Sequence, residues 1–201
     1  MGMKIVTEKD ESPRMIATLE ELMGSKVNVG CLDGEHAYLA AIHEYGATIR
    51  PKNAQYLTIP CNPKAKGKKA SSFNDLYTLR LDSGELFLVR NKGKDKLEFM
   101  YWLTKSVTIP ARPFLAPGHD EYAEQVVDKW KTALGQVIGG KMSIDQYLDG
   151  IGQELASRIK TYARNLNSPA DSRITQEAKG SSNPLVDTGN MIEGITWEVE
   201  W

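Results

Sequence analysis

The chain has 201 residues and a net charge of −1, with 25 Lys and Arg against 26 Asp and Glu, a balance that argues against a dedicated nucleic-acid or acidic-lipid binder. Hydrophobic residues make up 41% and charged residues 25%, which excludes wholesale disorder, a collagen-like chain and a disulfide scaffold. The longest apolar runs, such as residues 38–42, are far shorter than the ~20 residues that cross a bilayer, so we expect no membrane span. The two cysteines, Cys31 and Cys61, form no CxxC pair and favour a reducing compartment.

The near-neutral average hides an asymmetry of charge along the chain. Residues 50–112 include 13 basic and five acidic residues, a net charge of +8, and the rest of the chain has a net charge of −9. Such a division suits a subunit that joins head to tail with further copies, because unlike surfaces then face each other.

The first part of the chain predicts a helix, a strand and a second helix. A Ser-Pro pair at residues 12–13 is typical of a helix start, and apolar residues recur at helical spacing from there to Gly24. Alternation over residues 26–32 predicts a half-buried strand. The second helix, over residues 36–45, ends at Gly46, where a chain can leave through the left-handed region.

The basic middle of the chain has the pattern of antiparallel strands. Residues 77–81 alternate, residues 86–90 form an apolar run, and residues 97–107 are rich in aromatic and branched side chains. Turn sequences separate these runs, so we predict a three-stranded meander. Residues 61–72 have no apolar periodicity, and we expect a mobile loop there without a compact element.

The C-terminal part predicts two long helices, a loop and a strand. Helical spacing of apolar residues marks one helix from 122 to 137 and another from a capping serine at 143 to residue 162. Residues 167–184 are polar and interrupted by Pro and Gly, which predicts a long exposed loop. Alternation over residues 195–201 predicts a final strand.

Together these elements predict an α+β fold in a single domain, residues 1–201. An antiparallel sheet packs against the two long C-terminal helices and the short N-terminal helix. The β-meander is an inserted subdomain at about residues 64–107.

Three patterns that could carry chemistry have simpler structural explanations. Residues 135–142 match the glycine and lysine spacing of a phosphate loop, but Met142 replaces the required hydroxyl residue and the segment leaves a helix rather than a strand. His36 and His43 are two helical turns apart, about 10.5 Å along the axis, which is too far to share one metal ion. Cys31 lies on the apolar side of its strand, as a buried unreactive thiol does. We therefore expect no catalytic residue, no metal ion and no cofactor.

The meander carries a candidate basic surface of seven lysines with aromatic residues between or beside them. Cations interleaved with aromatic rings can bind nucleic acid. Solvated loop charge explains the same lysines without a ligand, and an acidic protein partner is a third interpretation. The seven residues are Lys64, Lys66, Lys68, Lys69, Lys92, Lys94 and Lys96.

Three short motifs follow one another along the chain: AAIHEYGA at residues 40–47, IPARPFL at 109–115 and PLVDTGNM at 184–191. With the helix after the second motif and the strand after the third, they cover the chain from about residue 27 to its last residue. In this order they resemble the tail-completion, or head-tail joining (neck), proteins of tailed bacteriophages. The resemblance implies these assembly or scaffold positions: Tyr45, Gly46, Pro110, Arg112, Pro113, Phe114, Asp187, Thr188 and Gly189.

The second motif makes physical sense as an extended segment. Pro110 and Pro113 fix a path with few hydrogen-bond donors, from which Arg112 and Phe114 project as a charge and an aromatic anchor. Arg112 could instead be the partner of a local carboxylate or helix end. The Asp-Thr-Gly sequence at 187–189 is typical of a capped turn before the last strand.

The resemblance implies a virion structural protein rather than an enzyme. It implies a ring, usually hexameric, that caps the head-proximal end of the tail and is assembled in the host cytoplasm. Its partners are further copies, head-closure or connector proteins, and tail tube or tail terminator proteins. The alternatives are a head-closure (stopper) ring on the capsid side, a protein that contacts channel DNA without sequence preference, and, least favoured, a small hydrolase that uses residues 135–141. We also expect segments 61–72 and 167–183 to become ordered only on assembly, because they lack the apolar content to fold alone.

Overall fold

The structure, a computed structural model, describes residues 10–93, 96–172, 175–176, 179–180 and 182–201. The chain forms two compact units. The helical unit comprises Met1–Ala37, Leu115–Ala163 and Glu193–Trp201, and the meander unit comprises Tyr38–Phe114 and Arg164–Ile192. Helices and antiparallel sheets occur together, so the predicted α+β fold class is confirmed.

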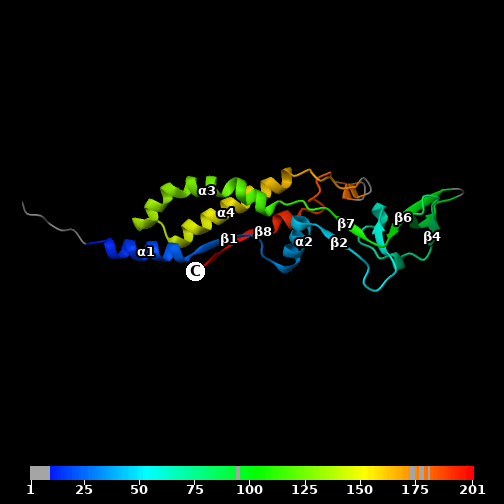
Figure 1. Ribbon diagram of the computed structural model, residues 1–201, viewed down its shortest axis with the longest axis horizontal. Coiled ribbons are helices and arrows are strands. Elements are labelled where there is room, and N and C mark those ends of the chain that lie inside the picture. The colour runs from blue at the N-terminus through cyan, green and yellow to red at the C-terminus, as the bar shows by residue number, and fades with distance from the viewer. Residues whose placement is uncertain (1–9, 94–95, 173–174, 177–178, 181) are drawn as a thin grey trace, which may run out of the picture. The chain divides into compact units, whose positions relative to one another are not determined.

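The helical unit combines long helices with a two-stranded sheet. Strands β1 and β8 pair antiparallel, from Lys26 opposite Glu200 to Cys31 opposite Ile195. In Figure 1, α3 and α4 run side by side and the sheet lies along α4. The predicted helices and strands are present in this unit. Their bounds are α1 Ser12–Gly24, β1 Lys26–Cys31, α3 Leu115–Ile138, α4 Ile144–Asn165 and β8 Ile195–Glu200.

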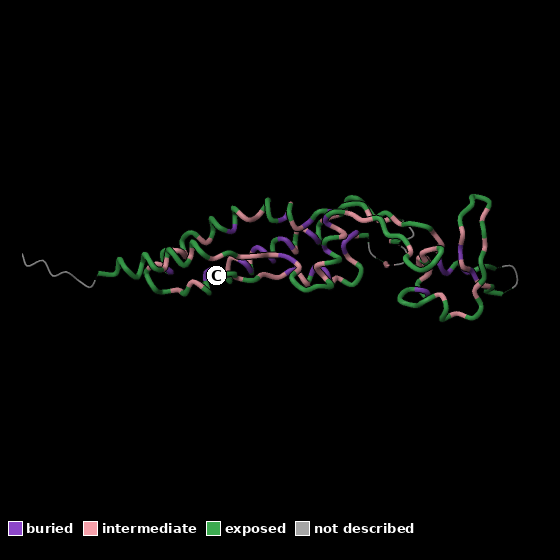
Figure 2. Tube along the Cα trace, turned by 60° about the horizontal axis from the view of Figure 1, so that its bottom comes forward, coloured by how far each residue is buried: buried purple, intermediate pink, exposed green. Residues whose placement is uncertain are grey.

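An apolar cluster holds the helices of this unit on the sheet. Val137, Tyr147 and Leu148 are buried at its centre, and the cross-strand partners Val27 and Val199 pack against them. Figure 2 shows buried positions concentrated in α4 and exposed ones along α1. Full burial of one large apolar side chain contributes about 1.5–3 kcal/mol, so this cluster stabilises the packing of the helices on the sheet.

Two glycines let α4 approach both of its neighbours closely. A Cβ atom on Gly150 would lie less than 3.0 Å from the Trp130 ring of α3, and one on Gly152 would lie less than 3.0 Å from the Trp197 ring of β8. Each glycine costs about 1 kcal/mol relative to alanine in a helix interior. Here that cost is offset by the packing of an indole ring directly on the helix backbone.

The turn between α3 and α4 explains the segment that matches a phosphate loop. Gly140 adopts a left-handed conformation with a φ of 69°, which ends α3. The Ser143 hydroxyl accepts the Gln146 N–H at 3.1 Å, and the Gln146 side chain accepts the Ser143 N–H at 3.2 Å. This reciprocal cap starts α4, so residues 135–142 form the end of one helix and the turn to the next.

The meander unit contains a four-stranded sheet rather than the three strands predicted. Its strand order is β3-β6-β5-β4, and all neighbours are antiparallel. The additional strand β3 has only four residues and ends at a proline, so it is too short to show a clear alternation. The bounds are β3 Leu57–Pro60, β4 Tyr77–Arg80, β5 Leu86–Asn91 and β6 Leu97–Thr104.

The strand predicted over 97–107 is divided into two in the structure. Its first part is β6, and β7 (Val107–Ile109) instead pairs antiparallel with β2 (Ala47–Ile49). Helix α2 (Gly34–Tyr45) comes just before β2 and ends at Gly46, as predicted.

The segment 61–72 is not the loop without compact elements that the sequence predicts. It contains two short 3-10 turns, η1 (Pro63–Ala65) and η2 (Ala70–Ser72). Ala65 is fully buried against Met100 and Tyr101, and the Tyr101 hydroxyl donates to the Lys68 carbonyl at 2.9 Å. The prediction was wrong because one small side chain and a few backbone carbonyls anchor this segment, and neither leaves a periodic apolar signal. The segment is therefore packed within its own unit.

Candidate functional site: the polar hub around Arg112

The first two motifs meet where α2 ends. Gly46 has a φ of 74°, and a Cβ atom there would lie 2.9 Å from the Ala111 backbone nitrogen. Next to this contact, the Arg112 N–H donates to the His43 carbonyl at 2.6 Å. Only glycine combines the left-handed conformation with so close an approach of two backbones, which explains the Tyr-Gly exit of the first motif.

Glu44 ties the second motif to α2 by its side chain. Its carboxylate is buried and accepts the Phe114 N–H at 2.8 Å. Pro110 and Pro113 have no N–H, so Phe114 supplies one of the few donors of this extended segment. Phe114 itself is fully buried, so the aromatic side chain of this motif packs into the interior of the chain. The sequence analysis missed Glu44 as a site residue, although it precedes Tyr45 in the first motif.

Arg112 lies at the centre of a buried network that we call the polar hub, formed by Arg112, Asp171, Lys179 and the carbonyl groups of residues 169 and 170. The Arg112 side chain is 4% exposed, and its Nη2 lies 2.8 Å from Asp171 Oδ1. Its Nε donates to the Pro169 carbonyl at 2.7 Å. Arg112 is therefore the partner of a nearby carboxylate, one of the two interpretations of the sequence, and not an outward-pointing charge.

Asp171 bridges two cations and extends the hub toward the third motif. Its Oδ2 lies 2.5 Å from Lys179 Nζ, and the two side chains are 10% and 8% exposed. Lys179 also donates to the Asn183 carbonyl at 2.6 Å, and the Asn183 side chain accepts the Leu185 N–H at 2.8 Å. The prediction of an exposed loop is therefore wrong at Asp171 and Lys179. Its residues 173–174, 177–178 and 181 lie outside the described part of the chain.

His43 adds a titratable group beside the hub. Burial, and then the positive charge of Arg112, lower the pKa of His43, and the Asp171 carboxylate partly opposes this shift. No described residue is a hydrogen-bond partner of its Nδ1. A neutral imidazole therefore fits a site that already holds two cations and a single carboxylate.

The Asp-Thr-Gly turn of the third motif lies at the surface. Asp187 forms an ion pair with Lys66 at 2.5 Å, and both side chains are exposed. The Thr188 hydroxyl accepts the Asn190 N–H at 3.4 Å, at the start of α6 (Asn190–Glu193). Gly189 has a φ of 87°. These contacts are those of a capped turn, which is the structural interpretation of this motif.

Tyr45 is the most exposed site residue of the first motif. Its side chain is 81% exposed, and that of Tyr38, two helical turns earlier on α2, is 67% exposed. Two aromatic side chains on one helix face are characteristic of interface anchors. Of the predicted assembly positions, Tyr45 thus lies exposed at the surface, whereas Arg112 and Phe114 are buried.

The seven lysines of the candidate basic surface do not form a single free cationic surface. Lys64 pairs with Glu98 at 2.8 Å, and Lys66 pairs with Asp187. Hydrogen bonds from Lys64 and then from Arg90 lower the pKa of Glu98 to about 2, so these charges neutralise one another. Lys94 lies outside the described residues. The remaining lysines are exposed: Lys68, Lys69, Lys92 and Lys96.

The described ranges also lack a grouped metal site and a membrane-spanning helix. Within them, no three His, Cys, Asp or Glu side chains are grouped so that they could hold a metal ion. No helix in these ranges has the length and apolar character to cross a membrane. Burial, and then the charge of Asp33, raise the pKa of Cys31 to about 11, so its thiol stays protonated and unreactive near neutral pH.

Comparisons of the chain with protein-family models, curated proteins and solved structures gave no match.

Proposed function

We propose that this chain is a structural joining protein of tailed bacteriophage particles, which caps the head-proximal end of the tail and connects it to the head. The observation that supports this proposal is the convergence of the motifs. The segments of residues 40–47 and 109–115 are bonded to each other around Arg112, and Asp171, Lys179 and Asn183 continue the bonds to residue 185. The residues that carry the resemblance thus form one connected scaffold.

The chemistry of the hub favours a structural role over catalysis. Arg112, Asp171 and Lys179 are bound to one another and to backbone carbonyls. Arg112 and Lys179 both form ion pairs with Asp171, and such buried polar contacts favour one fixed arrangement of the chain. A joining protein needs such rigidity, because its contact surfaces must keep their geometry while two large assemblies are held together.

The proposed partners follow from the same role. Further copies of the chain form a ring, with connector or head-closure proteins on one side and tail tube or tail terminator proteins on the other. The exposed aromatic side chains of Tyr38 and Tyr45 offer anchors for such contacts. The ion pairs of Lys64 and Lys66 count against channel DNA as the main partner of the lysine-rich segment.

The test is electron microscopy of particles from a phage that lacks this protein, before and after purified protein is added. We expect separate DNA-filled heads and separate tails, which join on addition. Protein with Arg112→Met should fail to join them, and the matched variant Arg50→Met, at an exposed position, should succeed. Joined virions without the protein would contradict the proposal. Heads that lose their DNA would indicate a head-closure ring instead.

A further inference from the structure

The two compact units carry opposite net charges. The helical unit has 9 basic and 17 acidic residues, a net charge of −8, and the meander unit has 16 basic and 9 acidic residues, a net charge of +7. The charge asymmetry of the sequence therefore coincides with the division of the fold. Unlike units attract each other over a distance set by the ionic strength.

The meander unit has an open hollow at one end of its four-stranded sheet. It has a volume of about 510 Å³ and lies where the β4–β5 turn meets the end of β6. Strand pairing places Arg80 beside Leu86, and Leu86 beside Leu103. The Arg80 cation and the two leucines therefore lie on the same face of the sheet. Lys105 also lines the hollow. We call this site, formed by Tyr56, Arg80, Leu86, Leu103 and Lys105, the basic hollow.

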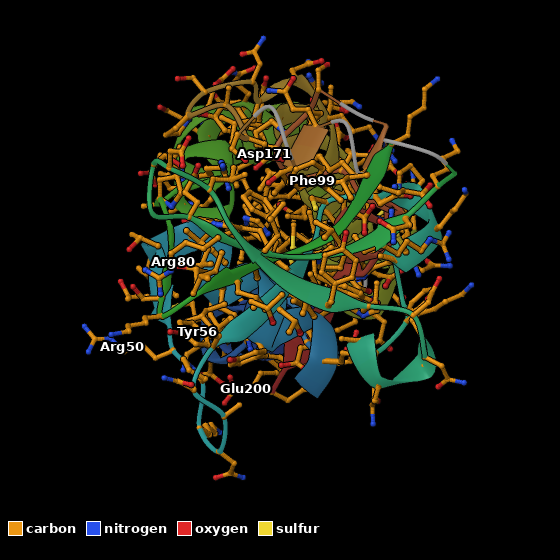
Figure 3. All side chains as sticks on the ribbon, turned by 90° about the vertical axis from the view of Figure 1, so that its right-hand side faces the viewer. Arg50, Tyr56, Arg80, Phe99, Asp171 and Glu200 are labelled. Atoms are coloured by element: carbon orange, nitrogen blue, oxygen red, sulfur yellow. The ribbon has the colours of Figure 1, made fainter. Side chains whose placement is uncertain are left out.

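The cations of the basic hollow are available to a partner. Arg80 and Lys105 are both exposed, and neither forms an ion pair with any described residue. Glu85 also lines the hollow, and its carboxylate accepts the Ser83 hydroxyl at 3.1 Å. In Figure 3, Arg80 and Tyr56, which both line the hollow, are labelled at the left of the view. The hollow therefore combines free positive charge with a partly apolar floor.

The helical unit carries a complementary feature on α3. Asp120, Glu121 and Glu124 are exposed within the first turns of this helix, and we call them the acidic ridge. Asp120 and Glu124 are four residues apart, so they lie on one face of the helix. Val127, one turn further along, is 45% exposed. The ridge thus offers carboxylates beside an apolar side chain, which matches the composition of the basic hollow.

We propose that the basic hollow of one copy of this chain receives the acidic ridge of a second copy. The hollow is open, so a helix face can reach it, and its free cations are opposite in charge to the carboxylates of the ridge. The contact joins two different surfaces, and its repetition builds a ring or a filament. A polyanion such as DNA fits less well, because the helical unit of the same chain, with a net charge of −8, repels it.

This inference deepens the proposed joining role, because it names the contact between the copies of a ring. Its test uses two charge-reversed variants of the full chain. One variant carries Arg80→Glu and Lys105→Glu, and the other carries Asp120→Lys and Glu124→Lys. Sedimentation velocity at an ionic strength of about 0.01 M, where charges act over ~30 Å, measures the association of each protein alone and of the two mixed.

We expect wild-type chains to associate at low salt. Each variant alone should associate with an affinity at least about tenfold lower than that of the wild type. The mixed variants should regain the wild-type association, because each supplies the charge that the other lacks. A third variant with Lys92→Glu and Lys96→Glu has the same change in net charge at exposed sites outside the hollow. It should associate like the wild type. Circular dichroism melts show whether all variants fold.

Several outcomes would overturn the inference. They are a wild-type chain that stays monomeric at low salt, a mixture that does not regain association, and a control as weak as the hollow variant. Duplex DNA binding that is lost in the hollow variant, with self-association unchanged, would show that the hollow takes a polyanion instead. Head-tail joining is scored separately. If both variants join heads to tails normally, the contact is wrong and the joining role stands. If the mixed variants associate but heads and tails are not joined, the contact stands and the joining role is wrong.

Discussion

The helical unit and the meander unit are stabilised in different ways. In the helical unit, an apolar cluster and two glycines bring α4 close to α3 and to β8. In the meander unit, Arg112, Asp171 and Lys179 are buried as a charged network. Close apolar packing responds to changes in side-chain volume, whereas a buried ion network responds to the loss of one charge. Changes of charge and changes of volume should therefore destabilise different parts of this chain.

Removal of the central charge of the polar hub should have the largest effect. Arg112→Met keeps a long side chain but leaves Asp171 with one cation and the Pro169 carbonyl without its donor. Breaking a buried ion network in this way costs about 3–5 kcal/mol. Urea unfolding followed by hydrogen exchange should show this loss in β2 and β7 of the meander unit.

The matched control for this prediction is Arg50→Met, which removes an exposed guanidinium from the same unit. It should change the free energy of unfolding by less than about 0.5 kcal/mol. If Arg112→Met were equally mild, the hub would not be the element that holds this unit together.

A change of volume should act on the helical unit with a smaller effect. Gly152→Val would place side-chain atoms where the Trp197 ring lies, and such overpacking costs about 1–3 kcal/mol. Thermal unfolding, together with Trp fluorescence, should report the loss and the displacement of the indole. Gly135→Ala on α3, where no described atom lies within 4 Å of the new Cβ, should instead stabilise the chain by about 1 kcal/mol. Equal effects of the two changes would contradict the close packing of α4.

Acidification should produce the smallest of the three effects, and it should act on the meander unit. Burial and Arg112 lower the pKa of His43 in the folded chain, so the unfolded chain binds the proton more readily. Stability is then complete above the unfolded value of about 6.5 and falls as the pH drops below it. Denaturant midpoints measured between pH 7 and pH 5 should decline, and His43→Gln should flatten the decline.

The range of that experiment is set by Glu98. Its pKa is held at about 2 in the folded chain, so its contribution is lost only as the pH falls from about 4.3, its ordinary value, toward 2. Measurements above pH 5 therefore isolate His43. A midpoint that does not change between pH 7 and pH 5 in the wild type would show that His43 does not sense the hub.

Elements with an apolar period could be predicted from the sequence. The spacing of buried side chains located α3, α4 and β8, and Gly46 was identified because a helix end followed by a left-handed residue has a local signature. These features depend on neighbours within a few positions of the chain. Strand β3 was not found, because four residues that end in a proline are too few for a pattern.

The partners within the polar hub could not be predicted in the same way. Arg112 and Asp171 are 59 positions apart, and Asp171 lies in a polar segment that has the composition of an exposed loop. A pattern of apolar residues shows which side chains avoid water, but it does not show which carboxylate is buried with which cation. The resemblance singled out Arg112, and only the structure gave its partners.

The pairing of β1 with β8 has a consequence for synthesis of the chain. Lys26 lies opposite Glu200 and Cys31 opposite Ile195, so β1 leaves the ribosome long before its partner strand has been translated. Domains generally fold as units during synthesis, and the meander unit, which ends at Ile192, is complete first. A product terminated before residue 195 would leave β1 with an open edge that can pair with other chains. Loss of the residues after Ile192 alone would therefore disturb the helical unit, which contains β8, and leave every segment of the meander unit in place.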